Sequence, residues 1–310
     1  DAQESRGLGD VYKRQELSGQ RVLVTGASGF TGRYVIERLR AAGCDVHDLH
    51  SGDTATSVNL LDRAALKQHV ARVRPQRVVH LAAISFVAHG DADEIYRVNV
   101  VGTRNLLEAL ASLDEAPSNV LLASSANVYG NASGVLDEQA PLSPQNDYAV
   151  SKMAMEAMAA LWIDQLPLTL VRPFNYTGVG QDEKFLIPKI VAHFRRGADV
   201  IELGNTDVSR DFNDVRGVAA AYEGLLALPG NGQTYNVCSG QEHSLHEVIE
   251  RMRGISGRDI EVKVNPAFVR ANEVKSLRGD NGKLRAAVGS LPDFDLGETL
   301  RWMYQARAEA

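Results

Sequence analysis

Short apolar runs alternate with longer segments in which apolar residues recur every three or four positions. Buried strands are predicted at five of the runs, namely residues 21–25, 46–49, 77–82, 120–124 and 168–171. The segments between them predict helices. One helix ends near residue 42, and the others cover residues 61–73, 96–110 and 148–166. Strands that alternate with helices form βαβ units with right-handed crossovers, so the pattern predicts an α/β fold with a doubly wound parallel sheet.

The alternation loosens after Pro173. Residues 175–184 and 204–214 are polar and resemble loops, 235–237 predict one more strand of the sheet, 244–255 a helix and 259–264 a strand. We therefore expect a main domain of residues 20–173 that also receives residues 211–240. Residues 174–210 and 241–310 are expected to form a smaller C-terminal region that covers a substrate.

Composition narrows the class of protein. The 310 residues are 44% hydrophobic and carry a net charge of −6, without the basic excess that is typical of nucleic-acid binding. Two cysteines, Cys44 and Cys238, favour a reduced, cytoplasmic protein over a disulfide scaffold. No apolar run approaches the roughly 18 residues that a membrane span requires. Residues 1–19 lack apolar periodicity, and we expect them to be a mobile leader that is not native.

A glycine-rich segment joins the first predicted strand to the first helix. TGASGFTG at residues 25–32 places glycines at Gly26, Gly29 and Gly32. Such glycines permit a tight turn, a close approach of the backbone to a pyrophosphate, and close packing of helix and strand. The free N–H groups and the dipole of the helix then hold the anion. The glycine pattern alone also fits an ordinary turn, but its position favours a dinucleotide site.

The form of the dinucleotide is not determined. An acid at the end of the second strand binds the ribose of NAD, and a cation there suits NADP. Asp48, His50, Ser51 and Asp53 lie near this point, and His50 is neither an acid nor an arginine. The choice between NAD and NADP therefore stays open.

Tyr148 and Lys152 are four residues apart in a predicted helix, so their side chains share one helical face. A lysine ammonium beside a phenol lowers the phenol pKa, which lets Tyr148 exchange a proton near neutral pH. Ser124 and Ser125 end the fourth predicted strand, where a hydroxyl can bind a substrate carbonyl. An isolated YxxxK is usually a surface pair, but here it follows a phosphate loop and a serine pair in chain order. These groups predict hydride transfer between a nicotinamide and a carbonyl carbon.

TGxxGxxG at 25–32, LAA at 81–83, Asn99, SSANVYG at 124–130 and YxxxK at 148–152 resemble the extended short-chain dehydrogenase/reductase family over residues 21–303. The resemblance implies a Rossmann-like fold and a catalytic set of Ser125, Tyr148 and Lys152. It also implies that the cofactor, NAD(P)H, contacts Gly26, Ser28, Gly29, Phe30, Thr31, Gly32, His50, Asn59, Leu60, Leu81, Ala82, Ala83, Asn99, Ser124, Tyr148 and Lys152.

The residues after Ser125 bear on the reaction. The 4,6-dehydratases of this family carry an acid directly after the active-site hydroxyl, whereas this chain has Ala126 and Asn127, which cannot act in elimination. Reduction of a ketone is therefore the favoured reaction. The alternatives are a 4-epimerase with tightly bound NAD and, less favoured, a dehydratase or a non-catalytic NAD(P) sensor.

Segments of the C-terminal half resemble the GDP-mannose branch of the family. They are GNTDVSRDF at 204–212, YNVCSGQE at 235–242 and RANEV at 270–274. The resemblance implies a GDP-sugar substrate and reduction of the C4 ketone of GDP-4-keto-6-deoxy-mannose to a GDP-rhamnose type of product. Arginines bind phosphates bidentately, which suits Arg210 and Arg270 to the diphosphate. The substrate residues are expected to be Ser85, Asn127, Asn175, Arg210, Arg270 and Glu273, and Arg172 is placed near the sugar nucleotide.

Apolar residues such as Met155, Met158 and Trp162 extend beyond one face of the helix at 148–166. Members of the family pair this helix with the one at 96–110, which implies a homodimer held by a four-helix bundle. His193, His243 and His246 form no ligand-like cluster, so no metal is expected.

Overall fold

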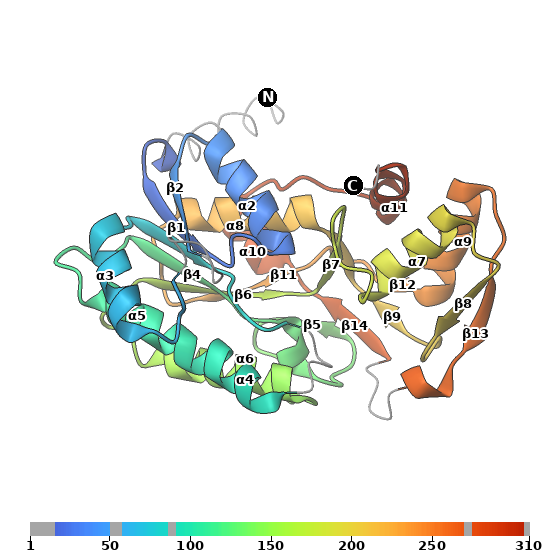
Figure 1. Ribbon diagram of the computed structural model, residues 1–310, viewed down its shortest axis with the longest axis horizontal. Helices are drawn as coiled ribbons and strands as arrows, with labels where there is room; N and C mark the ends of the chain where they lie inside the picture. Colours follow the sequence, from blue (N-terminus) through green and yellow to red (C-terminus); the bar gives the residue numbers. More distant parts are fainter. Residues whose placement is uncertain (1–15, 50–57, 86–90, 270–274, 307–310) are drawn as a thin grey trace.

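The computed structural model describes residues 16–49, 58–85, 91–269 and 275–306. At its centre is a six-stranded parallel sheet in the order β11-β6-β4-β3-β1-β2 (Figure 1). The strands are β1 (Arg21–Thr25), β2 (Asp45–Leu49), β3 (Arg77–His80), β4 (Asn119–Ala123), β6 (Leu168–Pro173) and β11 (Thr234–Val237). β2 and β3 pair in parallel with opposite edges of β1. Successive strands are therefore added to the sheet on one side of β1 first and then on the other side. Ligands bind outside the carboxyl ends of the strands at such a switch point.

Helices cover both faces of this sheet. On one face, α2 (Phe30–Ala41), α8 (Val215–Ala227) and α10 (Gly282–Val288) contribute to one apolar core. On the other face, α3 (Arg63–Val73), α5 (Thr103–Ala111) and α6 (Asp147–Ala160) contribute to a second core, with α4 (Ala92–Tyr96) beside α6 (Figure 1). The doubly wound α/β fold predicted from the sequence is confirmed, as is the further sheet strand at 235–237. This strand, β11, lies at the edge of the sheet and pairs in parallel with β6.

Two helices differ from the prediction. The helix expected at 96–110 is divided, because a π-helical segment at Arg97–Gly102 joins α4 to α5. α6 ends at Ala160 rather than at residue 166, and the chain continues in turns. Trp162 nevertheless packs against the second core.

A smaller unit is assembled from the C-terminal half of the chain. Its apolar core lies among α7 (Leu186–Arg196), α9 (Leu245–Ser256), α11 (Leu296–Gln305) and the parallel pair β8 (Val200–Leu203) and β13 (Glu261–Val264). Short strands connect the two units. They are β7 (Asn175–Thr177) with β10 (Phe212–Asp214), and the sheet of β12 (His243–Ser244), β9 (Ser209–Arg210), β14 (Ser276–Gly279) and β5 (Val135–Leu136).

Two boundaries differ from the expected ones. Leu17 is fully buried in the core with α2 and α8, and the Gly19 N–H donates to the carbonyl of Gly43, so residues 16–19 belong to the fold rather than to a leader. Leu284 and Val288 of α10 pack into the same core. The chain therefore returns to the main domain after residue 241, where α10 packs against both α8 and β11.

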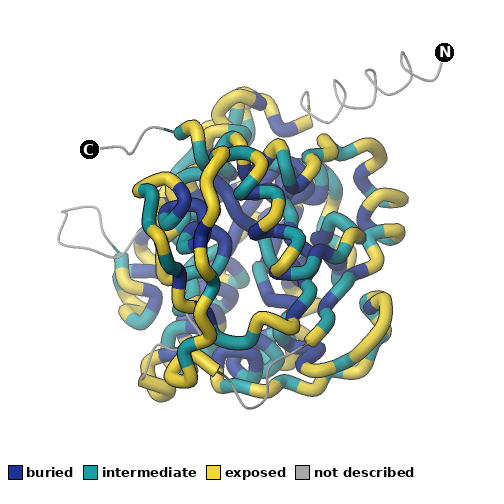
Figure 2. The backbone as a smooth tube through the Cα atoms, turned by 90° about the vertical axis from the view of Figure 1, so that its right-hand side faces the viewer, coloured by how far each residue is buried: buried dark blue, intermediate teal, exposed yellow. Residues whose placement is uncertain are grey.

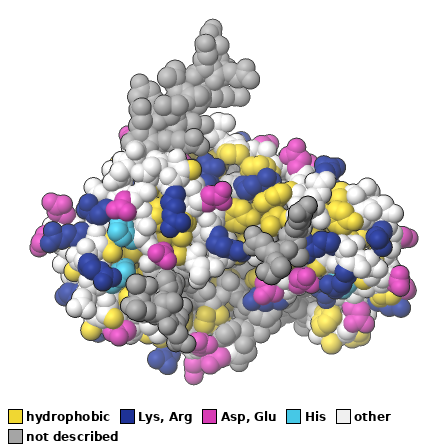
Figure 3. All heavy atoms as spheres, turned by 45° about the horizontal axis from the view of Figure 1, so that its top comes forward, with side chains coloured by type: hydrophobic (Ala, Val, Ile, Leu, Met, Phe, Trp, Pro, Cys, Tyr) yellow, Lys and Arg dark blue, Asp and Glu magenta, His cyan; other side chains and the backbone are white. Residues whose placement is uncertain are grey.

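Buried residues lie mainly in the interior of the molecule, and exposed residues lie mainly on its outer turns (Figure 2). Acidic and basic side chains are interspersed on the face that Figure 3 shows. Within the described ranges, none of the helices has the length and apolar character that a membrane crossing requires.

Candidate active site

A cavity of about 660 Å³ opens at the carboxyl ends of the central strands. This volume lies within the roughly 300–1,000 Å³ that is typical of ligand sites. Its walls come from the glycine-rich segment, the ends of β3, β4 and β6, the start of α6, and β7 and α7 of the smaller unit. Both units therefore contribute to one site.

The glycines at the start of α2 leave no room for side chains. Gly26 has a φ of +70°, and a Cβ there would lie 2.7 Å from the backbone nitrogen of Ala82. A Cβ on Gly32 would lie 2.3 Å from the carbonyl oxygen of Gly26. Both approaches are shorter than van der Waals contact, so the loop conformation requires glycine at these positions.

Helix α2 begins at Phe30, and its N-cap, Gly29, supplies no side-chain hydrogen bond; its first turn has no acidic residue. Its first N–H groups and the positive end of its dipole face the cavity, which Phe30, Thr31 and Gly32 line. A pyrophosphate fits this cradle because it supplies the acceptors that the helix start lacks. The residues present therefore suit a dinucleotide cofactor.

Most of the residues expected at the cofactor line this cavity. They are Gly26, Ser28, Gly29, Phe30, Thr31, Gly32, Asn59, Leu60, Leu81, Ala82, Ala83, Ser124, Tyr148 and Lys152. The Ser124 hydroxyl is buried without a hydrogen-bond partner among the described residues, which leaves a polar group for a ligand. His50 lies outside the described residues.

Asn99 differs from the expectation. It is buried behind the cavity wall, where its amide donates to the Ile84 carbonyl (3.1 Å) and accepts from the Ile84 N–H (2.8 Å). Its Nδ2 also donates to Ser151 Oγ at 3.0 Å. Asn99 therefore fixes the chain after β3 and is not among the residues that line the cavity.

Ser125, Tyr148 and Lys152 come together at the junction of the two units. Asn146 caps α6 by accepting from the Ala149 N–H, which sets Tyr148 and Lys152 in the first two turns of the helix. The Ser125 hydroxyl hydrogen-bonds the Tyr148 phenol. Lys152 Nζ donates to the Ala123 carbonyl at 2.7 Å, so β4 anchors the lysine beside the serine pair. All three side chains line the cavity, as the sequence predicts.

The charge state of this set differs from the expected one. Burial raises the pKa of Tyr148 to about 12, and the Ser125 hydrogen bond only partly opposes this shift. Burial also lowers the pKa of Lys152 to about 8, against the attraction of the Glu156 carboxylate. The expected lowering of the Tyr148 pKa by Lys152 is not found, because burial of the phenol dominates and Lys152 is not among the groups that shift this pKa. Tyr148 is thus a neutral phenol, which is the form that can donate a proton.

The side of the cavity opposite the phosphate loop carries amides and hydroxyls. Ser85, Asn127 and Asn175 line it. Asn127 Nδ2 donates to Ser125 Oγ at 3.2 Å, and the Nδ2 of Asn175 is buried without a partner among the described residues. Ala126 and Asn127 offer no acid or base beside Ser125, which agrees with the sequence.

Arg172 was expected near the sugar nucleotide, but it is not among the residues that line the cavity. Its guanidinium donates to both carboxylate oxygens of Glu156, at 2.9 and 2.7 Å, and to the Tyr129 hydroxyl at 3.0 Å. The hydrogen bonds to Glu156 raise the pKa of Arg172 despite its burial. Arg172 is consequently a buried partner of Glu156, and Glu156 lies one turn after Lys152.

Arg210 lies in β9 of the smaller unit, is buried, and donates to the Ser209 carbonyl at 2.8 Å. Among the described residues it does not line the cavity, although its neighbour on β14, Leu277, does. Arg270 and Glu273, the other expected diphosphate and ribose contacts, lie outside the described residues.

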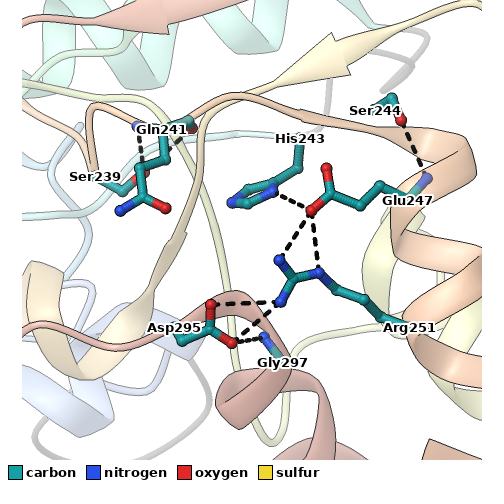
Figure 4. A network of polar contacts seen from close by, with 8 residues as sticks. All are labelled: Ser239, Gln241, His243, Ser244, Glu247, Arg251, Asp295 and Gly297. Atoms are coloured by element: carbon teal, nitrogen blue, oxygen red, sulfur yellow. Dashed lines mark hydrogen bonds and ion pairs between the residues drawn. The ribbon is translucent and has the colours of Figure 1, made fainter. Parts of the chain in front are cut away.

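A polar network supports the strand beside Arg210. His243 pairs with Arg210 across β12 and β9, and its Nδ1 lies 2.9 Å from Glu247 Oε1. Arg251 joins that carboxylate (2.9 Å) to Asp295 (3.1 Å), which caps α11 (Figure 4). The network ties α9 and α11 to the sheet that holds Arg210.

Sequence reasoning did not identify several residues that line the cavity. They are Tyr176 in β7, Gln181 after that strand, residues 185–188 at the start of α7, and Tyr222 of α8. The amphipathic spacing of α7 was a usable signal. Nothing in the sequence indicates which side of a loop Tyr176 faces.

Curated relatives cover nearly the whole chain. GDP-6-deoxy-D-mannose reductase of Pseudomonas aeruginosa is 34% identical over 94% of this chain and 99% of the relative. GDP-6-deoxy-D-talose 4-dehydrogenase of Aggregatibacter actinomycetemcomitans is 33% identical over 87% of this chain and 92% of the relative.

Two solved structures share the fold throughout. A candidate epimerase from Burkholderia cenocepacia J2315 is 53% identical, with a TM-score of 0.87 over 93% of this chain and 97% of that chain. RMD from Pseudomonas aeruginosa, complexed with NADPH, is 34% identical, with a TM-score of 0.82 over 92% of this chain and 97% of that chain. The model of the NAD dependent epimerase/dehydratase family matches residues 22–238. The chain therefore belongs to the NAD dependent epimerase/dehydratase family, the extended short-chain dehydrogenases/reductases, and is an NAD(P)-dependent enzyme.

Proposed function

We propose that the protein reduces the C4 ketone of GDP-4-keto-6-deoxy-mannose to a GDP-6-deoxyhexose of the GDP-rhamnose type. The observation that carries this proposal is the neutral, buried Tyr148 beside Ser125 and Lys152, in a cavity whose neighbouring positions, Ala126 and Asn127, hold no acid or base. The two curated relatives named for GDP-6-deoxy sugars support the substrate class.

In the proposed reaction, Ser125 and Tyr148 bind the oxygen of the C4 ketone. NAD(P)H, when bound at residues 26–32, supplies the hydride. Tyr148 donates its proton to the C4 oxygen, because the raised pKa keeps the phenol protonated. The Lys152 ammonium stabilises the negative charge that forms on the phenol oxygen. Proton and hydride together turn the ketone into a secondary alcohol.

The substrate would extend away from the phosphate loop. Asn127 and Asn175 present amide groups to the sugar side of the cavity. Arg210, together with Arg270 and Glu273, is proposed to hold the GDP portion, since an arginine binds a diphosphate through parallel N–H donors.

The proposal is tested by mixing the purified protein with GDP-4-keto-6-deoxy-mannose and following the absorbance of NADH and, separately, of NADPH. Oxidation in proportion to the sugar establishes the reductase and identifies the preferred cofactor. NMR of the product identifies the C4 configuration, for which the names of the two relatives represent different outcomes. The matched control is Tyr148→Phe. Oxidation of neither cofactor while the sugar binds would contradict the reductase.

A 4-epimerase with tightly bound NAD is the second candidate, favoured by the similarity to the Burkholderia cenocepacia structure. An epimerase needs no net reductant and retains its cofactor on purification. Conversion of a GDP-hexose to its C4 epimer without added NAD(P)H would therefore support this candidate over the reductase.

We also propose a homodimer through the α4–α5 segment and α6. Val101 is 45% exposed in the π-helical segment, and Leu161 is 78% exposed just after α6. Pairing with a second copy would cover both. A monomeric mass at micromolar concentration in light scattering would contradict the dimer.

A further inference from the structure

Three hydrogen bonds tie the first two turns of α2 to residues 176–180 of the smaller unit. Tyr34 Oη donates to the Val179 carbonyl at 2.7 Å, and Arg33 donates to the Gly180 carbonyl at 2.9 Å. The third joins Thr31 Oγ1 to Tyr176 Oη at 2.7 Å. Only in this third bond do both partners line the cavity.

Several contacts hold Tyr176 in place. β7 pairs in parallel with β10, and Gln181 Nε2 donates to the Tyr176 carbonyl. The ring stacks on Phe30, with centroids 6.1 Å apart and an angle of 12° between the planes. Tyr176 therefore reaches the phosphate loop from the other unit with little freedom to turn away.

The Thr31 and Tyr176 hydroxyls carry two protons, and the hydrogen bond between them uses one. Neither Thr31 Oγ1 nor Tyr176 Oη makes another hydrogen bond among the described residues. Burial raises the pKa of Tyr176, so the phenol keeps its proton. A phenol is a stronger donor than an aliphatic alcohol, which favours donation from Tyr176 to Thr31 Oγ1. The Thr31 proton then remains for a ligand.

That remaining proton lies at the start of α2, beside the N–H groups that face the cavity. Donors that converge on one point with a helix dipole select an anion. We propose that Tyr176 is a positioning residue for the cofactor: by donating to Thr31, it directs the Thr31 hydroxyl at the pyrophosphate of NAD(P)H. The inference concerns the cofactor and holds whichever sugar is reduced.

The test measures binding without any sugar, so that its outcome is independent of the proposed reaction. Fluorescence quenching gives the Kd of NADPH and of NADH, and competition gives the Kd of ADP-ribose, which has the pyrophosphate but no nicotinamide. We expect Tyr176→Phe to raise all three values by about tenfold. The Thr31 hydroxyl is then no longer directed at the pyrophosphate, so one hydrogen bond to a charged group is lost. An unchanged Kd for ADP-ribose would overturn the assignment to the pyrophosphate.

The matched control is Tyr34→Phe. It removes a bond between the same helix and the same segment, but Tyr34 does not line the cavity. We expect its Kd values to stay within about twofold of the starting protein, in the range of a surface change. Equal losses in both variants would show that the bridge only holds the two units together, and would overturn the proposal.

A double-mutant cycle tests whether Tyr176 acts through Thr31. Thr31→Val should weaken ADP-ribose binding as much as Tyr176→Phe does, and the double variant should be no weaker than either single variant. Thr31→Ser, which keeps the hydroxyl, should retain most of the affinity. Additive losses would mean that each side chain acts alone, and would contradict the positioning role. Thermal unfolding of each variant confirms that the comparison is between folded proteins.

Discussion

The two sides of the cavity are built in different ways. The phosphate side comes mainly from one continuous segment, β1 through the start of α2, and its shape depends on glycines that no other residue can replace. The opposite side is assembled from β7, α7 and the short strands around Arg210, which are far apart in the sequence. A site with one local half and one assembled half can keep its cofactor while its substrate changes.

The largest effect is expected where the two sides meet. Tyr148→Phe removes the proton donor but keeps the ring, so kcat should fall by about 10²–10⁴, far more than the Kd of NADPH changes. Stopped-flow measurement of NADPH oxidation and a separate binding titration give the two values. A variant that retains its rate would remove Tyr148 from the proposed mechanism.

Gly32→Ala should weaken cofactor binding at the phosphate side of the cavity and leave the opposite side unchanged. Its Cβ would lie 2.3 Å from the Gly26 carbonyl oxygen, and an overpacked contact costs about 1–3 kcal/mol, or roughly tenfold to a hundredfold in the Kd of NADPH. Gly254→Ala is the control, since a Cβ there has no neighbour within 4 Å and helix α9 gains stability from alanine. Equal cofactor affinity in both variants would show that the loop can relax.

Arg210→Ala should weaken substrate binding and leave the phosphate side of the cavity unchanged. We expect the KM for the GDP-sugar to rise about tenfold through loss of a charged hydrogen bond, with the Kd of NADPH unchanged. The exposed Arg258, also in the smaller unit, is the control. A change in kcat with an unchanged KM would place Arg210 outside the diphosphate site.

The smallest effect is expected from pH. Because burial lowers the pKa of Lys152 to about 8, its ammonium is lost as pH rises through 8, and the rate of reduction should fall over pH 7–9. Tyr148, with a pKa near 12, stays protonated throughout. Between pH 8 and 10.5 the unfolded lysine binds more protons than the folded one, so this group should make the protein more stable as pH rises. A rate that is flat to pH 10 would contradict the need for a charged lysine.

The sequence predicts the main sheet well, because each buried strand is a short apolar run between clear helical patterns. It fails at α8, where nearly every residue from Val215 to Ala227 is buried. A helix covered on all sides loses the polar face that reveals its period. α7 was missed for another reason: Pro188 resembles a helix breaker, yet it lies in the first turn, where proline is tolerated.

The residues of the candidate site also fall into two groups, those that the sequence predicts and those that it does not. Gly26, Ser125, Tyr148 and Lys152 belong to local motifs, and the structure places them at one cavity as predicted. Arg172 shows the limit of such reasoning, since its partner Glu156 is sixteen residues away in the sequence and only the fold brings them together. Pairings of this kind decide whether an arginine faces a ligand or another side chain.

The π-helical turn at Arg97–Gly102 restricts how this helix can change in length. A π-turn is equivalent to one extra residue within an α-helix, and one residue corresponds to a rotation of about 100°. Deleting a single residue before Asn99 would let α4 and α5 join as one regular helix. The deletion would then either turn the Asn99 amide away from Ile84 and Ser151 or shift the residues that precede Asn99 in the helix. The extra residue of the π-helical turn thus sets the direction of the Asn99 amide, which holds the chain after β3.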